Sequence, residues 1–137
     1  EVMKQLDCLF IHVPKFNNWY KPFGRFMYIK SLPIGLPAIA DFIAGKGYST
    51  EIIHLGLECI LNKQFNILKY IESTAAKIIA VPLHWHHQSF DVIDTTKKIK
   101  KHFPQAYTVL GGITASIFAD EIIQQYEFID GVIREKP

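Results

Sequence analysis

The sequence has 137 residues, of which 49% are hydrophobic and 20% charged, which is enough for one globular domain with a continuous core. A formal net charge of +2 is too small to indicate a nucleic-acid partner. No apolar run approaches the roughly 20 residues of a membrane span and no signal peptide is recognisable, so we expect no membrane partner and a cytoplasmic location.

The first segments predict a buried strand followed by an unusual loop. Residues Leu6–Val13 are almost continuously apolar and end at Pro14, as expected of a strand buried on both faces of a parallel sheet. Residues Pro14–Lys30 show no period and contain many aromatic residues among Asn, Lys and Gly. Such a loop is a ligand lid, a surface that docks another domain, or a hydrophobic cluster, and the sequence leaves these alternatives open.

The middle of the chain predicts two more βα units. Helical spacing of apolar residues predicts a helix at 31–47, because the two prolines there fall in or before the first turn. Glu51–Leu55 is the second expected strand and Gly56–Lys63 a connection. Asn62 is a candidate N-cap for a helix that extends to Ala75, and Lys77–His84 is the third expected strand.

The last third repeats the alternation. Val92, Thr96, Ile99 and Phe103 share one helical face, and Pro104 ends that helix. A strand from Tyr107 leads through two glycines into one further helix, and residues 129–133 are the last expected strand.

This alternation of strands and helices predicts an α/β fold. We expect a Rossmann-like (flavodoxin-like) three-layer sandwich with a five-stranded parallel sheet in the order 2-1-3-4-5. Ligands of such sheets bind beyond the carboxyl ends of the strands. The loop at 14–30, the LHWHHQS turn and the GGITAS turn are all expected at that edge.

The GGITAS turn, which begins at Gly111, is the most informative segment. Gly111 and Gly112 lack Cβ atoms, so a flat group can lie against their peptide planes. The hydroxyls of Thr114 and Ser116 either cap the following helix or bind the polar edge of a ligand. The alternative is an ordinary glycine turn with a capping hydroxyl. If a ligand lies here, a bulky residue at position 112 should abolish binding and leave the fold intact.

Histidines gather in the LHWHHQS turn. Because neighbouring residues of an extended segment point in opposite directions, His84, His86 and His87 are not expected to form a metal site. We interpret His84 and Trp85 as a hydrogen-bonding group and a flat apolar wall for an organic ligand, with packing of Trp85 over the sheet edge as the alternative. No GxGxxG follows the first strand, which excludes a dinucleotide fold, and no phosphorelay receiver motif or hydrolytic triad is recognisable.

Taken together, five segments of the chain resemble the N-terminal cobalamin (vitamin B12)-binding domain of B12-dependent radical SAM proteins. They are PIGLPAIADFIAGKGY, EIIHLGLE, AVPLHWHHQSFDVI, VLGGITASIFADEII and IDGVIRE. The similarity extends from Leu6 to Glu135, and GGITAS after a fourth strand is its most specific part.

This resemblance implies which residues contact cobalamin. In that family the corrin lies across the carboxyl edge of the sheet, and its nucleotide tail descends beside the third and fourth strands. Gly111 and Gly112 are then expected to line the tail pocket, with Ile113, Thr114, Ala115 and Ser116 near it. Leu83, His84 and Trp85 occupy the place of a small polar motif whose serine is absent here. The corrin rim is expected to meet Ser31, Leu32, Pro33 and Gly35.

The departures from the family pattern define the remaining expectations. No D-x-H-x-x-G motif follows the first strand, and His12 should point into the fold, so we expect base-off cobalamin with no lower ligand assigned. The CxxxCxxC motif of a radical SAM cluster is missing, so the 4Fe-4S cluster and S-adenosylmethionine are expected only in a downstream radical SAM domain. We therefore expect no catalysis by this domain alone.

The resemblance also leads to a prediction for the whole chain. Residues 1–137 are expected to be a single cobalamin-binding domain, a fragment of a larger methyltransferase or related C–C bond-forming enzyme, because the chain starts at Glu1 and not at Met. Cys8 and Cys59, in a strand and a loop, are expected to be reduced thiols. The alternative function is a degenerate Rossmann-like domain without corrin that docks another protein.

Overall fold

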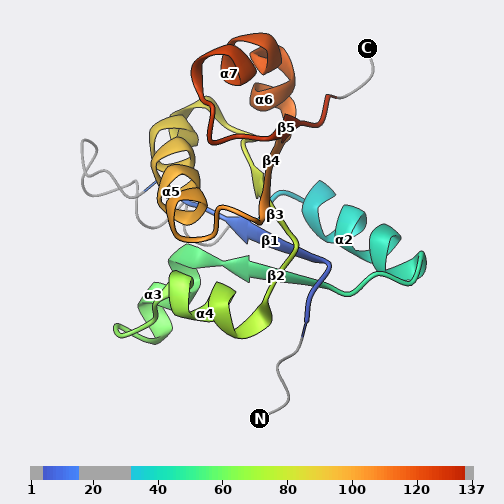
Figure 1. The fold of residues 1–137 in the computed structure, drawn as a ribbon, viewed down its shortest axis with the longest axis vertical. Coiled ribbons are helices and arrows are strands. Elements are labelled where there is room, and N and C mark those ends of the chain that lie inside the picture. Colours follow the sequence, from blue (N-terminus) through green and yellow to red (C-terminus); the bar gives the residue numbers. More distant parts are fainter. Residues whose placement is uncertain (1–4, 16–31, 135–137) are drawn as a thin grey trace.

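A computed structural model describes residues 5–15 and 32–134 (Figure 1). Its five strands are parallel and form one sheet in the order β2-β1-β3-β4-β5, which confirms the expected topology. The strands are β1 (Cys8–His12), β2 (Thr50–His54), β3 (Ile78–Pro82), β4 (Tyr107–Gly111) and β5 (Gly131–Val132). No helix within the described ranges is both long and apolar enough to cross a membrane.

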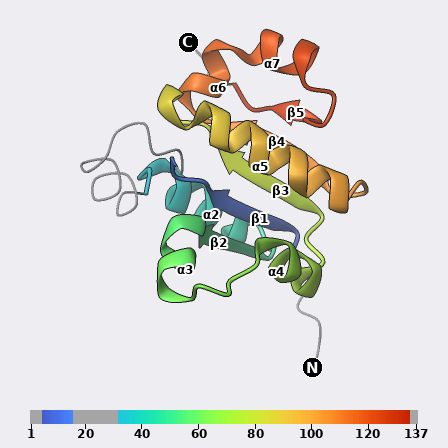
Figure 2. The ribbon, with the colours of Figure 1, turned by 90° about the vertical axis from the view of Figure 1, so that its left-hand side faces the viewer.

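Helices cover the sheet unequally (Figures 1 and 2). On one side lies α2 (Gly35–Gly45), over β1 and β2. The opposite side is covered by α3 (Leu55–Leu61), α4 (Ile67–Thr74) and α5 (Ser89–His102), with the 3₁₀ turn η1 (His86–Gln88) before α5. Next to β4 and β5 pack α6 (Ile113–Ile117) and α7 (Ala119–Gln125). The domain is thus the expected three-layer Rossmann-like sandwich.

Two hydrophobic cores hold these layers together. The larger core joins the sheet to α5, α6 and α7 through residues such as Val81, Leu110 and Ile99. A smaller core joins β1 to α2 through Phe10 and Leu36. All five residues of β1 are buried, which explains why this strand reads as a continuous apolar run without alternation.

Three sequence-based predictions of elements are wrong. The connection expected at Gly56–Lys63 contains α3, whose short, mostly exposed run has too few buried residues for a visible period. Asn66 caps α4 by accepting from the backbone N–H groups of Leu68 and Lys69, whereas Asn62 accepts from Gln64 in a preceding turn. The single helix expected after Gly112 is divided at Phe118 into α6 and α7.

The cysteines differ in their surroundings. Cys8 is buried in β1, and burial raises the pKa of its thiol to about 11. Cys59 is exposed on α3 and not in the loop expected from the sequence. Both are free thiols. Beyond Lys15, the aromatic loop lies outside the described residues.

Candidate binding site at the carboxyl edge of the sheet

The turns that follow β3 and β4 lie side by side. The backbone N–H of Leu83 donates to the carbonyl of Gly111 at 2.7 Å, and the N–H of Ala115 donates to the carbonyl of Leu83 at 3.2 Å. The hydroxyl of Thr114 donates to the carbonyl of His84 at 2.9 Å. The structure therefore brings together the two turns that the sequence placed at one edge.

This contact between the turns requires a glycine at position 112. The φ of Gly112 is +98°, in the region that favours glycine, and a Cβ atom there would lie 2.9 Å from the carbonyl oxygen of Leu83. A bulky residue at this position would collide with the protein's own backbone, which argues against the expectation that such a variant leaves the fold intact.

The expected contact residues of the GGITAS turn divide by burial. Thr114 and Ala115 are buried, whereas Gly111, Gly112 and Ser116 are half-buried and Ile113 is exposed. Neither hydroxyl caps α6. That of Thr114 bonds to the neighbouring turn, and that of Ser116 lies 3.4 Å from the carbonyl oxygen of Ile133. The buried residues thus shape the edge, while the others are accessible to a ligand.

The turn after β3 contains a cluster of aromatic rings. Trp85 stacks on His87, with ring centroids 5.9 Å apart and planes inclined by 10°. It also makes edge-to-face contacts with the rings of His84 and of His12, which lies at the end of β1. The ring centroids are 5.2 Å and 6.3 Å from that of Trp85. Trp85 therefore packs over the sheet edge, as in the simpler of the two interpretations, while it remains half-buried.

The rings of His12, His84 and His87 lie around Trp85 in this cluster. Among the described residues, no group of three or more His, Cys, Asp or Glu side chains is arranged to hold a metal ion. His12 is fully buried, as expected from its place in β1, and its ring lies 4.7 Å from that of His54. Burial, with smaller effects of His86 and Lys15, lowers the pKa of His87, which favours its neutral form.

The expected corrin-rim residues precede or begin α2. Leu32 and Pro33 are half-buried, Gly35 is exposed, and Ser31 lies outside the described residues. Because α2 leads back to the start of β2, its first turn faces the carboxyl edge of the sheet. Leu83 is buried and His84 half-buried in the turn opposite. The sequence did not single out Gln88, because a glutamine in a polar turn gives no sign that it is buried.

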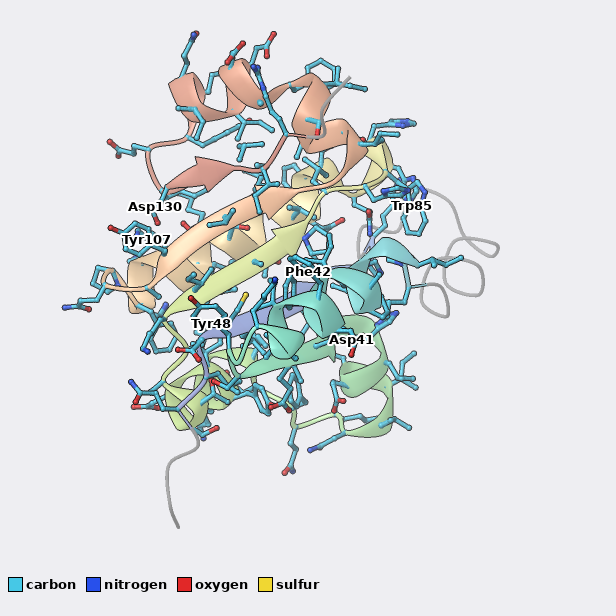
Figure 3. The ribbon with its side chains drawn as sticks, turned by 90° about the vertical axis from the view of Figure 1, so that its right-hand side faces the viewer. Asp41, Phe42, Tyr48, Trp85, Tyr107 and Asp130 are labelled. Atoms are coloured by element: carbon cyan, nitrogen blue, oxygen red, sulfur yellow. The ribbon has the colours of Figure 1, made fainter. Side chains whose placement is uncertain are left out.

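Beside α2, one face of β3, β4 and β5 is not covered by any helix of the described chain, as Figure 3 shows. Val81, Leu110 and Val132 face the core under α5, so their sequence neighbours face the opposite side. We call this strip the open lane. Its members are Ala80, Pro82, Val109, Gly111, Gly131 and Ile133, of which Ala80 packs against the smaller core under α2. A Cβ atom on Gly131 would meet nothing within 4 Å, and one on Gly111 only Ile133 at 3.9 Å.

Other hollows of the described surface lie away from these turns. One of about 680 Å³ lies between α2 and the first half of β2, and one of about 300 Å³ between α3, α4 and α5. The candidate site is instead an open surface, formed by the carboxyl edge and the open lane. Its glycines, Gly111 and Gly131, add no side chain to that surface, so a ligand could approach the backbone there.

These features define a Rossmann-like α/β domain whose two glycine-containing and aromatic turns meet at the carboxyl edge of the sheet. A family model described as the B12 binding domain matches residues 29–137, a range that includes every expected contact residue. The chain therefore belongs to the B12-binding domain family, and its resemblance to cobalamin-binding domains is confirmed.

A curated relative extends the comparison. The hopanoid C-3 methylase of Methylococcus capsulatus is 23% identical over 109 residues, which are 79% of this chain and 20% of the relative. The chain thus spans about a fifth of that relative's length. No solved structure matches the chain.

Proposed function

We propose that this chain is the cobalamin-binding module of a larger B12-dependent radical SAM enzyme that transfers methyl groups or forms C–C bonds. Membership of the B12-binding family supports cobalamin as the cofactor, and similarity to a relative named a methylase supports the class of reaction. The cobalt of bound cobalamin supplies the group-transfer chemistry, and the protein holds and orients the cofactor. The iron–sulfur cluster and S-adenosylmethionine belong to a separate downstream domain in this proposal.

The open lane supports this proposal most directly. Its glycines, Gly111 and Gly131, leave space that a Cβ atom would fill, and the lane reaches the carboxyl edge at Pro82 and Gly111. In the proposal, the nucleotide tail lies along the lane and the corrin spreads over the edge. Leu32, Pro33 and Gly35 approach its rim from α2.

The contact residues then have two roles. Leu83, Thr114 and Ala115 are buried and hold the two turns in place. Gly111, Ile113 and Ser116 present accessible surface to the tail, while His84 and Trp85 form the wall beside it. His12 is fully buried and would have to leave the core to reach cobalt. Because the proposed tail lies along the lane and away from cobalt, the proposed form is base-off cobalamin, with its lower ligand unassigned.

Hydroxocobalamin and gel filtration test the proposal. We expect the corrin absorbance to co-elute with the wild-type protein. Gly111→Leu and Gly131→Leu should fold, because nothing lies closer than 3.9 Å to either added Cβ atom, and should weaken binding at least about tenfold by filling the lane. Gly45→Leu is the matched control, because it adds the same side chain in open space at the far end of α2.

Two outcomes would contradict the proposal. A folded wild-type protein that elutes without corrin would refute cobalamin binding. Full binding by both lane variants would place the tail elsewhere. Circular dichroism of each variant verifies that the fold is retained.

The second candidate is a docking domain that binds no corrin. Large apolar side chains are exposed near the carboxyl edge, among them Phe90 (70%), Ile117 (67%) and Phe118 (50%). Such a surface also suits contact with another protein domain. Absence of corrin from a folded sample in the same experiment would favour this function.

A further inference from the structure

Gln88, the last residue of η1, is a buried polar side chain with both ends of its carboxamide bonded. Only 1% of its surface is exposed. Its Nε2 donates to the carbonyl oxygen of Val13 at 2.9 Å, and its Oε1 accepts from the backbone N–H of Trp85 at 3.3 Å. Because burial of an unbonded carboxamide is costly, these two bonds explain how Gln88 is accommodated inside the fold.

The bond to Val13 links the segments that follow two neighbouring strands, β1 and β3, although these segments are far apart in the sequence. Val13 follows β1 directly and is 0% exposed, and 75 residues separate it from Gln88. The next residue, Pro14, packs closely on Gly56. A Cβ atom added to Gly56 would lie 2.6 Å from the Cγ atom of Pro14. Gln88 is therefore anchored to a fixed part of the backbone.

The bond to Trp85 fixes the other side of the turn. Thr114 and Gly111 hold residues 83–84 from the side of β4, as described above. Gln88 holds Trp85 from the side of β1. The indole ring, which lies over the ends of β1 and β3, is attached to the backbone segment between these two supports.

We propose that Gln88 is a positioning residue of the cobalamin site, which sets the place of Trp85 beside the open lane without contacting the cofactor. This inference rests on the proposed function for its ligand. The position needs a donor and an acceptor at the end of the side chain, which a carboxamide or a neutral carboxylic acid of this length provides. Leucine offers neither group, and an ionised glutamate cannot donate to Val13.

The first experiment follows Trp85 without any ligand. Trp19→Phe leaves Trp85 as the sole tryptophan, because the chain has two. In that background, Gln88→Leu should shift the Trp85 emission to longer wavelength and increase its quenching by acrylamide. Gln88→Glu should behave likewise at pH 8 and recover the wild-type emission as its carboxyl group gains a proton at lower pH. Gln124→Leu, exposed on α7, is the matched control.

The pH dependence of Gln88→Glu shows whether Gln88 positions Trp85 through its hydrogen bonds or only fills space. Recovery by Gln88→Glu is judged against the wild-type protein measured at the same pH, which corrects for any other effect of pH on the emission. A residue that only filled space would show no such recovery. If Gln88→Leu fails to fold, the pH-dependent recovery of Gln88→Glu still decides the question.

Cobalamin affinity is then measured on the same variants. We expect binding about tenfold weaker in Gln88→Leu and in Gln88→Glu at pH 8, recovery in Gln88→Glu at low pH, and no change in Gln124→Leu. Unchanged Trp85 fluorescence in both Gln88 variants would overturn the positioning role. Altered fluorescence with unchanged affinity would overturn its link to the cofactor. A wild-type protein that binds no cobalamin refutes instead the proposed function.

Discussion

The hydroxyl of Thr114 donates to the carbonyl oxygen of His84 across 2.9 Å, although 30 residues separate them in the sequence. Thr114 is 7% exposed, so its loss leaves a partly buried carbonyl with one bond fewer. This bond joins the turn after β4 to the turn after β3. The geometry of the carboxyl edge therefore depends on it.

Thr114→Val should remove this bond and keep the shape of the side chain. We expect the free energy of unfolding to fall by about 1 to 2 kcal/mol and cobalamin to bind more weakly. Urea unfolding and corrin titration measure the two effects. Thr96→Val is the matched control, because the hydroxyl of buried Thr96 bonds to Val92 within α5, whose carbonyl keeps its helical partner. Equal cobalamin affinity in both variants would contradict the prediction.

The two adjacent glycines should respond differently to alanine. Gly112→Ala places a Cβ atom 2.9 Å from the carbonyl of Leu83 at a φ of +98°, so we expect a loss of about 1 to 3 kcal/mol or more in unfolding free energy. Gly111→Ala meets nothing closer than 3.9 Å and should unfold at nearly the wild-type urea concentration. A Gly112→Ala variant as stable as Gly111→Ala would show that the turns can separate.

The order of the sheet could be predicted from the sequence because each strand is short, apolar and followed by a helical pattern. The errors occurred where tertiary contacts decide local structure. Asn62 and Asn66 are equally good caps by composition, and only the packing of Ile67 and Leu68 on the core selects Asn66. The sequence gives no sign of the break between α6 and α7 at Phe118, because the helical spacing of apolar residues continues through it.

The place of the two turns could be predicted from the sequence, but the contacts of their residues could not. Gly111 and Gly112 were correctly expected at the carboxyl edge, since topology fixes where a βα turn lies. Their roles differ, because Gly112 faces Leu83 and Gly111 faces the open lane. That difference depends on positions in three dimensions. For the same reason the sequence did not show that Gln88 is buried.

Asp130 should be important for attaching the short strand β5. Its Oδ2 accepts from Lys100 and from the N–H of Thr108, both at 2.7 Å. Burial opposes ionisation, but these hydrogen bonds prevail and lower the pKa of Asp130. Asp130→Ala leaves both donors without this acceptor, so urea unfolding should show a loss of about 1 to 3 kcal/mol. Asp94→Ala, which breaks the exposed ion pair with Lys98, should cost about 0.5 kcal/mol or less. Equal losses would contradict the assignment.

Asp7 should make stability depend on pH in acid. Lys77 and the N–H and hydroxyl of Ser49 bond to its carboxylate and lower its pKa from 3.8 to about 2. The folded state favours the ionised carboxylate of Asp7. The stability that this carboxylate contributes is therefore complete above the unfolded pKa and is lost as pH falls from about 4 to about 2. Urea unfolding at each pH should show this decline, and Asp7→Asn should remove it. Lys77→Met removes the largest cause and should give an intermediate slope. An Asp7→Asn slope equal to that of the wild type would contradict the prediction.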